Sequence, residues 1–471
     1  MTKDGSKLVV IGHGAAGLAA ALAAAEEAGD RRFPLEITVL EKASQAEAGG
    51  NTRWSPAYMR MAAVDRIAPD FEHDMQLASS GRADQVYFRT LAENAPRTIA
   101  WLQRNGVEFS IPVYYLSVGP PRIQPNGGGR AIVECLTQAA RQADVRILYG
   151  CRATYIAAGQ PCLYVLKTDG GHGEQTVEAD AIIFATGGFQ GSAEMMRAHF
   201  GPAAATMKLI SSGTRFDTGD GIRLAQHLGA SLSGDWNGMH AEPVDPRSRQ
   251  PAPVVLVYPY GVVVDRTGQR FFDEGSGLVH ETWEAFARDI HFSRPASIAY
   301  AILDSRLFEI QGVERAIRSE KPPYQAATLD ALAAMIDVPA ETLKKTVDSF
   351  NEAATGDSTR FDATRRDGLA TTNGLTPPKS NWARPITKAP FVAYPLVGAI
   401  AYTFGGIAAN EKAEVLGNAG IIPGLYAAGE VTGQFYGTAP NAVAMLRATV
   451  FGMIAGQEAV DFLARNGNQN R

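Results

Sequence analysis

The hydrophobic pattern near the N-terminus predicts a strand, a glycine turn and a helix in immediate succession. Residues 7–11 (KLVVI) form a short apolar run with the length of a buried strand. Gly12 to Gly17 follow at once with the spacing GxGxxG, and the Ala/Leu-rich segment after them predicts a helix over about 15–28. A second apolar run, at 35–40, ends at Glu41. This order predicts a βαβ unit with two parallel strands.

Helical and strand-like patterns then alternate as far as residue 188. Residues 70–106 have a mostly helical pattern, in which Pro96 predicts a break or a new helix start. A loop rich in proline and glycine, 111–129, ends in Gly127-Gly128-Gly129-Arg130 and leads into a predicted helix at 131–142. The segments after it predict a strand at 145–149, a hairpin near 152–178 and a strand at 181–185 that ends on Thr186-Gly187-Gly188.

The middle of the chain has a different character. Residues 241–260 contain five prolines, and strands are predicted at 253–258 and 261–265. Helices are predicted near 326–336 and 340–353, with Thr328 and Pro339 at their starts. The segment 355–390 is polar and rich in proline, which predicts irregular structure.

The last part of the chain returns to the strand–glycine–helix pattern, with Gly424 to Glu430 followed by a helix from about Ala442. We therefore predict an α/β fold. A Rossmann-like dinucleotide-binding domain, a βαβ unit within a three-layer sandwich, is built from residues 1–240 and 381–471. It is interrupted by an α+β cap domain at 241–380 that carries the substrate side of the site.

Composition excludes several classes of protein. The 44 Lys and Arg against 49 Asp and Glu give a net charge of −5, without the basic surplus of a nucleic-acid binder. The three cysteines, Cys135, Cys151 and Cys162, form no CxxC pair, which disfavours a dithiol centre, a metal site or haem attachment. No apolar stretch reaches membrane-spanning length, so no transmembrane segment is expected, and the cysteine usage favours the cytoplasm.

The glycine motif predicts a dinucleotide site because each residue has a physical task. Gly12 makes the tight turn, Gly14 lets a pyrophosphate approach the backbone, and Gly17 lets the helix pack closely on the strand. The helix N-terminus supplies free N–H groups and a positive dipole, and Glu41 would accept from the ribose hydroxyls. The alternative is an ordinary βα turn with chance glycines, which the full strand–turn–helix–strand context disfavours.

A resemblance to two-dinucleotide-binding flavoproteins identifies the dinucleotide as FAD. The segment Gly424-Leu-Tyr-Ala-Ala-Gly-Glu430 resembles the part of those proteins that holds the ribitol and flavin end, and Ala181–Gly188 resembles its companion segment ending in ATGG. The sequence contains no second GxGxxG unit of the kind that binds NAD(P)H.

Within these flavoproteins, the chain is similar to the fumarate reductase/succinate dehydrogenase flavoprotein superfamily over nearly its whole length. Glu41-Lys42 with Gly49–Arg53 resembles the loop that wraps the flavin ring. Thr214–Gly221 resembles the TGDG segment, and Gly261–Asp265 with Arg270–Glu274 resembles the G-x-R-F-x-x-E motif of the cap. The loop at 49–55, Gly127–Arg130 and Ile298–Asp304 look closest to tricarballylate dehydrogenases and related cobalamin-synthesis flavoproteins.

The motifs and the resemblance together predict the cofactor-binding residues. They are Gly12, Gly14, Ala15, Ala16, Gly17, Glu41, Lys42, Gly49, Gly50, Asn51, Thr52, Ala153, Ala185, Thr186, Gly187, Gly188, Thr218, Asp220, Gly429, Glu430, Asn441 and Val443.

Two departures from the family pattern concern the substrate. Fumarate reductases carry a carboxylate-binding His before Thr-x-Gly-Gly, where this chain has Tyr402. They also carry an Arg in a Gly-x-Asn-Arg string, whereas Gly437–Asn441 contains none, and Arg447 is expected inside a helix where it need not substitute. A fumarate-type dicarboxylate clamp is therefore not expected.

Other side chains are candidates for catalysis or for substrate contact. Tyr436 lies where 3-ketosteroid dehydrogenases carry a tyrosine that polarises a ketone, and a phenol can donate to a developing enolate. His240 and Arg306 lie near the positions of a substrate-contacting His and a proton-donating Arg in relatives. Arg53 and Arg60 are candidates for carboxylate binding, Tyr258 and Tyr260 for facing the cleft, and Arg270 with Glu274 for a proton path or, as we favour, a structural ion pair.

The predicted catalytic set is therefore Tyr436, Tyr402, Arg306, His240 and Arg53. The predicted reaction is hydride transfer between flavin N5 and a carbon beta to a carbonyl or carboxylate, giving an α,β-unsaturated acid or ketone. The expected partner is a small carboxylate or ketone, and the sequence identifies no electron acceptor. The alternatives are a ketone-directed desaturase of the 3-ketosteroid or 4-oxocyclohexanecarboxylate type, a fumarate reductase-like ene-reductase, and a non-catalytic flavin module.

Overall fold

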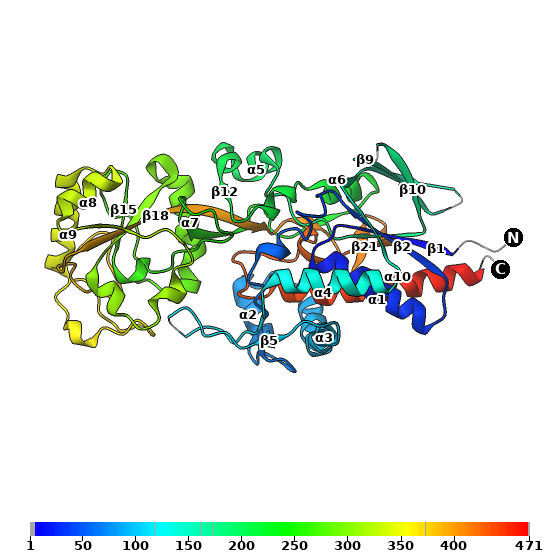
Figure 1. Cartoon of the computed structure of the whole chain (residues 1–471), viewed down its shortest axis with the longest axis horizontal. Coiled ribbons are helices and arrows are strands. Elements are labelled where there is room, and N and C mark those ends of the chain that lie inside the picture. Colours follow the sequence, from blue (N-terminus) through cyan, green and yellow to red (C-terminus); the bar gives the residue numbers. More distant parts are fainter. Residues whose placement is uncertain (1–4, 117, 161, 172, 373, 470–471) are drawn as a thin grey trace.

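A parallel sheet forms the centre of one end of the molecule (Figure 1). The computed structural model describes residues 5–116, 118–160, 162–171, 173–372 and 374–469. The sheet has the order β20-β21-β11-β1-β2-β7, parallel except for the β20–β21 edge pair. Its strands are β1 (Ser6–Ile11), β2 (Leu35–Glu41), β7 (Arg146–Tyr149), β11 (Ala181–Phe184), β20 (Glu414–Gly417) and β21 (Gly420–Ala427).

Alternate residues of β1 face two different cores, one on each side of the sheet. Leu8 and Val10 pack with helices on one face, whereas Val9 and Ile11 pack with a small antiparallel sheet on the other. The helices are α1 (Ala15–Asp30), α3 (Gln85–Arg104), α4 (Gly129–Gln142) and α10 (Ala444–Gln469), with α2 (Phe71–Ala78) beside them. The small sheet is β8 (Cys151–Ala158), β9 (Tyr164–Gly170) and β10 (Gln175–Ala179). This layering places the carboxyl ends of β1, β2 and β11 at one edge.

A second, largely antiparallel sheet occupies the other end of the molecule, around the long strand β18 (Phe391–Thr403) (Figure 1). β18 pairs with β16 (Ala299–Asp304) in its first half and with β14 (Met239–Val244) in its second half. The other strands are β12 (Lys208–Leu209), β15 (Val262–Asp265) and β17 (Tyr324–Ala326), and the helices are α7 (Val279–Ser293), α8 (Leu329–Ile336) and α9 (Ala340–Ala353).

The remaining strands and α-helices of the described residues are short. They are β3 (Met61–Ala63), β4 (Arg66–Ile67), β5 (Phe109–Ser110), β6 (Gln124–Pro125), α5 (Ala193–Phe200), α6 (Asp220–His227), β13 (Leu232–Ser233) and β19 (Gly406–Ile407). The predicted mixed α/β class is thus confirmed. The predicted domain boundaries at residues 241 and 380 stay a prediction. β14 runs across the first boundary, and it pairs with β18, which lies beyond the second.

Two local predictions were wrong. Pro96 lies inside α3 and does not break it. Proline removes one backbone hydrogen bond from the helix, but the face around Leu91, Ala95 and Ile99 is completely buried, and this packing keeps the turn helical. Residues 253–258 form only isolated bridges, Val244 to Val254 and Val255 to Ile317, followed by a short 3₁₀ turn at Tyr258–Tyr260. Their apolar character reflects burial on all sides, which an apolar run alone cannot distinguish from a strand.

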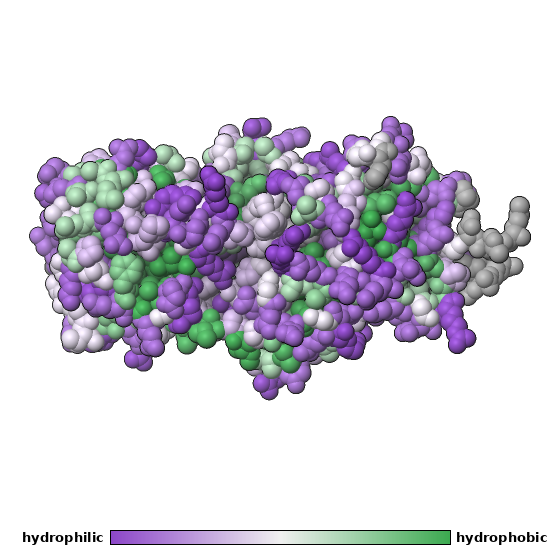
Figure 2. Space-filling model, in the orientation of Figure 1, coloured by the Kyte–Doolittle hydropathy of each residue, from purple (hydrophilic) through white to green (hydrophobic). Residues whose placement is uncertain are grey.

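The predicted hairpin near 152–178 is a three-stranded meander, and the C-terminal helix begins at Ala444. Hydrophilic side chains cover most of the face of the molecule drawn in Figure 2, and small apolar patches lie between them. Among the described residues, no helix is both long and apolar enough to cross a membrane.

Candidate active site

The glycine turn after β1 has the geometry that a dinucleotide requires. Gly12 has φ +113°, and a Cβ there would lie 2.3 Å from the carbonyl oxygen of Ala185. A Cβ on Gly17 would lie 1.9 Å from the Gly12 carbonyl oxygen. Only glycine therefore fits at either position, and α1 begins directly after the turn at Ala15, with the backbone of its first residues at the cavity edge.

Glu41, at the end of β2, is buried beside this turn. Its carboxylate accepts the backbone N–H of His13 at 2.9 Å and that of Ala43 at 2.7 Å. Burial raises the pKa of Glu41, and these two backbone bonds oppose that change. The carboxylate is thus held in place at the carboxyl end of the sheet, where the adenosine ribose of a dinucleotide would lie.

The loop 49–53 is tied to three other parts of the cavity wall. The amide of Asn51 donates to the Ala401 carbonyl oxygen at 2.8 Å and accepts from the Ser211 hydroxyl at 2.9 Å. Thr52 Oγ1 accepts from the backbone N–H of Ala15 at 3.1 Å, at the first residue of α1. Loop 49–53 is therefore fixed relative to both sheets.

Three charged residues that line the cavity, Lys42, Arg152 and Asp220, form a cluster. Lys42 Nζ donates to Thr218 Oγ1 at 2.6 Å and to Asp220 at 3.0 Å, and Arg152 makes two bonds to Asp220, at 2.9 and 3.0 Å. Burial alone would raise the pKa of Asp220, but its bonds to Arg152 and Lys42 outweigh burial and hold the pKa far below the ordinary value. Asp220 is thus a fixed anion near the start of α6.

The late glycine segment completes the cavity. Gly429 has φ +82°, and a Cβ there would lie 2.9 Å from the Cβ of Ala16 in α1. Glu430 is partly buried and accepts from the backbone N–H of Thr403 at 3.1 Å, and loss of solvent around its carboxylate raises its pKa to about 7. The segment after β21 therefore packs directly on the start of α1, as its resemblance to a flavin-binding segment implies.

One cavity is lined by most of the predicted cofactor residues. They are Gly12, Gly14, Ala15, Ala16, Glu41, Lys42, Gly50, Asn51, Thr52, Ala153, Ala185, Thr186, Gly187, Asp220, Gly429, Glu430 and Asn441. Gly17, Gly49, Gly188, Thr218 and Val443 do not line it. Gly17 packs α1 on the turn, and Thr218 orients Lys42.

The polar atoms of this cavity fit a large polar ligand. Thr186 Oγ1, Trp54 Nε1 and Asn441 Oδ1 are buried without a hydrogen-bond partner in the described structure, and all three residues line the cavity. Buried polar groups are normally paired. Together with the glycine turn and the N-terminus of α1, these unpaired atoms fit a dinucleotide such as FAD.

His240 lies in the same cavity, held between two carboxylates. Nδ1 of His240 is 2.9 Å from Glu284 on α7, and Nε2 is 3.2 Å from Glu242 on the same strand. Burial lowers the pKa of His240, but the hydrogen bonds to Glu242 and Glu284 outweigh it and raise the pKa to about 9. The imidazole is therefore a cation at neutral pH.

Tyr402 is the residue directly opposite His240 in the β14–β18 ladder, and the two ring centroids are 4.9 Å apart. Tyr402 lines the cavity, and its hydroxyl has no hydrogen-bond partner among the described residues. Burial raises the pKa of the phenol well above its ordinary value, and the carboxylate of Glu284 adds to this. The hydroxyl therefore stays protonated and able to donate.

Three of the predicted catalytic residues lie elsewhere. The Tyr436 hydroxyl accepts from the backbone N–H of Gly234 at 3.1 Å, outside the cavity. Arg306 is paired with Asp304 and the carbonyl oxygen of Pro385. Arg53 donates to the carbonyl oxygens of Ala46 and Ala48 at 3.0 and 3.1 Å. None of the three lines the cavity, because local backbone or carboxylate groups hold each side chain, and their catalytic roles stay predictions.

The remaining candidates for substrate contact also have structural partners. Arg60 pairs with Asp70 and Asp74. The hydroxyl of Tyr258 is 2.7 Å from that of Thr282, and the hydroxyl of Tyr260 donates to Ala363 at 2.9 Å. None of these three residues lines the cavity.

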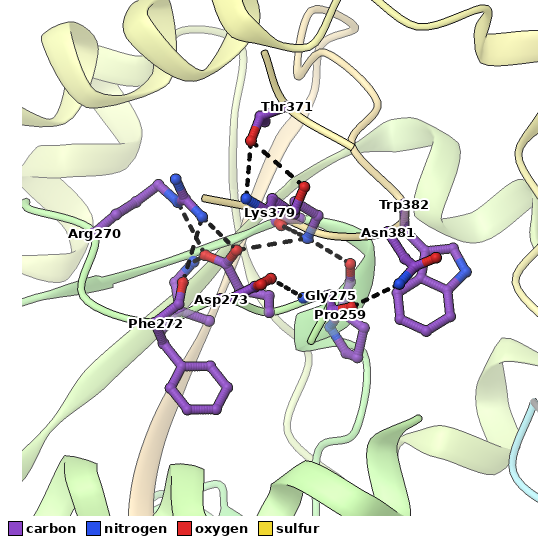
Figure 3. Close-up of polar contacts among 12 residues, drawn as sticks. Pro259, Arg270, Phe272, Asp273, Gly275, Thr371, Lys379, Asn381 and Trp382 are labelled. Carbon is purple, nitrogen blue, oxygen red and sulfur yellow. Dashed lines mark hydrogen bonds and ion pairs between the residues drawn. The ribbon is translucent and has the colours of Figure 1, made fainter. Parts of the chain in front are cut away.

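Arg270 and Glu274 form the expected structural ion pair, within a buried cluster that also contains Lys379 (Figure 3). Arg270 Nη2 donates to Glu274 at 2.7 Å, and Glu274 accepts from the Val263 N–H at 2.7 Å. Lys379 Nζ lies 3.7 Å from Glu274 and donates to the carbonyl oxygens of Pro259 and Gly261, at 2.6 Å each. The cluster joins the segments that contain Pro259, Arg270 and Lys379, and the second of these leads into α7, the helix that carries Glu284.

Several cavity residues have no motif in the sequence. They are Tyr58, Tyr115, Arg122, Glu242, Trp283 and Arg318. Arg447, which we expected to be uninvolved inside a helix, also lines the cavity from the first turn of α10 and stacks 4.0 Å from the Phe435 ring centroid. No group of three or more potential metal ligands occurs among the described residues.

The cavity and fold define an FAD-dependent oxidoreductase, and comparison with known proteins supports this class. The chain belongs to the FAD binding domain family, whose model matches residues 7–444. It is 27% identical over 96% of its length to a probable fumarate reductase of Shewanella frigidimarina, and covers 74% of that protein. It is 30% identical over 70% of its length to a 4-oxocyclohexanecarboxylate 2-dehydrogenase of Sinomonas cyclohexanicum, and covers 60% of that protein.

The fold is also that of a solved flavoprotein. The open conformation of a flavocytochrome c3 fumarate reductase superposes with a TM-score of 0.76 at 24% identity, over 98% of this chain and 79% of the other. The predicted superfamily and the FAD cofactor are thereby confirmed.

Proposed function

We propose that the protein is a dehydrogenase that desaturates a CH–CH bond next to a carbonyl or carboxylate. The observation that carries this proposal is the pairing of His240 with Tyr402 in one cavity with the glycine-rich FAD residues. The neutral phenol keeps its hydroxyl as a donor to an oxygen that gains negative charge, and the imidazolium beside it, whose N–H groups donate to Glu284 and Glu242, adds positive charge. Such an oxygen develops when the carbon alpha to a carbonyl loses its proton.

The residues that line the cavity are those that would bind the cofactor. The turn Gly12–Gly14 and the start of α1 would hold the pyrophosphate, Glu41 the ribose, and loop 49–53 with Gly429–Glu430 the flavin end. Bound FAD would supply the acceptor for the hydride that leaves the carbon beta to the carbonyl. This arrangement supports a Rossmann-like domain from 1–240 and 381–471 and a cap at 241–380 as the finer description of the fold.

Glu242 is the proposed acceptor of the alpha proton. It lines the cavity and lies 3.2 Å from His240 Nε2, so its carboxylate is held beside the substrate oxygen site. Glu284, on the other side of the imidazole, does not line the cavity and acts by keeping His240 charged and oriented.

The finer substrate assignment is to an acid of the tricarballylate type, which the loop at 49–55, Gly127–Arg130 and Ile298–Asp304 support. The ketone-directed alternative is favoured by the unpaired Tyr402 hydroxyl and by the 4-oxocyclohexanecarboxylate relative; Tyr436 gives it no support. The reductase alternative is favoured by the charged His240, whose proton would reach a substrate carbon through Glu242, and by the fumarate reductase relative.

Anaerobic flavin spectroscopy tests the proposal. Oxidised holoenzyme is mixed with saturated acids and cyclic ketones, and a substrate of a dehydrogenase bleaches the flavin absorbance near the rate of turnover. If only the reduced enzyme reacts, and only with the unsaturated compounds, the reductase alternative replaces the proposal. If no compound changes the flavin redox state in either direction, the protein is a non-catalytic flavin module.

A further inference from the structure

One buried arginine of the cavity has unused hydrogen-bond donors. Arg122 is 4% exposed, and its Nε and Nη2 atoms are buried without a hydrogen-bond partner. No carboxylate among the described residues forms an ion pair with it. A buried, unpaired charge is costly, so a group that is absent from the chain itself is needed to complete it.

Aromatic rings define how that group must approach. The Arg122 guanidinium carbon lies 3.7 Å from the Tyr58 ring centroid, 3.9 Å from that of Tyr114 and 4.9 Å from that of Tyr115. The tyrosine rings cover the guanidinium faces, and only the N–H groups in its plane remain for a ligand. Paired in-plane donors match the two oxygens of a carboxylate.

A second arginine lies against the same tyrosines. Arg318 Nη2 donates to the Tyr58 hydroxyl at 2.5 Å, and its guanidinium carbon is 5.8 Å from the Tyr58 ring centroid and 5.6 Å from that of Tyr115. Arg122 comes from the loop 111–129 and Arg318 from the segment that follows Ile317, so each reaches the cavity from a different part of the fold. No ion pair of Arg318 with a carboxylate occurs in the described structure either.

A chain of aromatic contacts places both arginines on the His240 side of the cavity. The Tyr115 ring centroid is 6.0 Å from that of Trp283, and the Trp283 centroid is 5.9 Å from the His240 ring. The predicted pyrophosphate site at Gly12–Gly14 is formed by other elements, β1 and α1. The unpaired positive charge therefore lies on the side of the cavity where His240 lies, away from the predicted pyrophosphate site.

We propose that Arg122 and Arg318 form a carboxylate receptor that selects anionic substrates for the reaction proposed above, on which this inference rests. Tyr58 separates the two guanidinium groups and holds both. The receptor takes the place of the dicarboxylate clamp that the sequence lacks, and it identifies the substrate as a carboxylic acid rather than an uncharged ketone.

Ligand binding to oxidised holoenzyme tests the receptor without turnover. The probes are cyclohexanecarboxylate, succinate and propane-1,2,3-tricarboxylate, with cyclohexanecarboxamide as the uncharged match, and the readouts are the flavin difference spectrum and tryptophan fluorescence. In R122M, carboxylate affinity is expected to fall about 10- to 100-fold, as for loss of charged hydrogen bonds. The amide is expected to bind weakly and equally to both proteins, and R122K to lie between them because it keeps the charge without the planar fork.

Several outcomes would overturn the receptor. They are carboxylate affinity within twofold of wild type in R122M, no binding of any carboxylate by the wild type, or loss of FAD from R122M, which would assign Arg122 to the cofactor. The matched control is R130M, because Arg130 is exposed on α4 and pairs only with Glu134. A purely structural role predicts a lower melting temperature for ligand-free R122M, whereas the receptor predicts no decrease because an uncompensated charge is removed.

This test separates the receptor from the proposed reaction. If carboxylates bind through Arg122 but never bleach the flavin, the dehydrogenase proposal fails and the receptor stands. If a compound bleaches the flavin while R122M and wild type bind it equally, the receptor fails and the dehydrogenase stands.

Discussion

His240 and Tyr402 are opposite each other in the β14–β18 ladder, and a register shift immediately follows His240. Met239 and His240 are opposite Thr403 and Tyr402, whereas Ala241 is opposite Ile400, so Ala401 is the extra residue. Bulges of this kind redirect side chains near active sites. The ladder thus fixes a cation and a phenol with ring centroids 4.9 Å apart, without help from any loop.

We expect Tyr402→Phe to lower kcat about 10²- to 10³-fold while FAD binding is retained, because one donor to the developing oxyanion is lost. Tyr436→Phe is the matched control, since it loses the same atom from a hydroxyl that bonds only the Gly234 N–H, and its effect is expected to stay below about tenfold. Steady-state kinetics with flavin content as normalisation measure both. Equal effects of the two variants would contradict the role of Tyr402.

The pH dependence follows from His240. Its pKa of about 9 in the folded protein is above the ordinary value of 6.5, so the interaction with the two glutamates stabilises the fold fully below pH 6.5 and is lost as the pH rises through 9. Activity that needs the imidazolium is also expected to fall as the pH rises through 9, which gives the pH profile an alkaline limb.

In Glu284→Gln one carboxylate is removed, and the alkaline limb is expected to move to lower pH. Glu93→Gln, at an exposed position of α3, is the control. The pH profile of kcat/KM measures the limb, and a titration of the imidazole by NMR assigns it to His240. An unchanged limb in Glu284→Gln would show that another group titrates.

The glycine turn predicts a sharp contrast within one helix. Gly17→Ala places a Cβ 1.9 Å from the Gly12 carbonyl oxygen, so the turn must open and FAD binding is expected to be lost. Gly29→Ala, near the end of the same helix, meets nothing within 4 Å and is expected to stabilise by up to about 1 kcal/mol. The flavin absorbance of the purified variants measures how much FAD each one retains. A Gly17→Ala variant with full flavin content would contradict the packing argument.

The buried cluster in Figure 3 predicts unequal effects of its members. Glu274→Ala leaves Arg270 and Lys379 without their shared carboxylate and is expected to destabilise by about 3–5 kcal/mol. Lys379→Met keeps the Arg270–Glu274 pair. Burial lowers the pKa of Lys379 to about 8, so its charge destabilises the fold at lower pH and stability gains as the pH rises from 8 toward 10.5.

Thermal unfolding of the holoenzyme at pH 7 and pH 9.5 measures both cluster variants. At both pH values, Glu274→Ala is expected to lose more stability than Lys379→Met. The gain in stability between pH 8 and 10.5 that Lys379 causes is expected to be absent in Lys379→Met. A larger loss in Lys379→Met than in Glu274→Ala would show that the two carbonyl contacts of Lys379 matter more than its charge.

The sequence predicts the cofactor side well because those residues are set by local geometry. Gly12 and Gly17 are required by contacts within one turn, and Glu41 follows its strand at a fixed spacing, so a motif contains the necessary information. The same holds for the segment Gly424–Glu430, where positive φ angles at Gly424 and Gly429 limit the choice of residue.

The substrate side was predicted poorly because it depends on contacts between distant segments. Arg122 and Arg318 meet through Tyr58 and Tyr115, and no local pattern records that they share a cavity. Tyr436 resembled a catalytic residue by its position in the chain, but its hydroxyl points to the Gly234 backbone. His240 and Tyr402 were found because relatives carry functional groups there, whereas Glu242 and Glu284 needed the folded structure to reveal them.

The strand β18 has a consequence for engineering new specificities. A chimera that exchanged residues 241–380 with a relative would cut β14 between His240 and Glu242 and separate the imidazole from its carboxylate. A graft that begins after Val244 and ends before Phe391 keeps the whole β14–β18 ladder with its native host. Such a graft would exchange Arg318 but retain Arg122, so the acid selected by a chimera would depend on both parents.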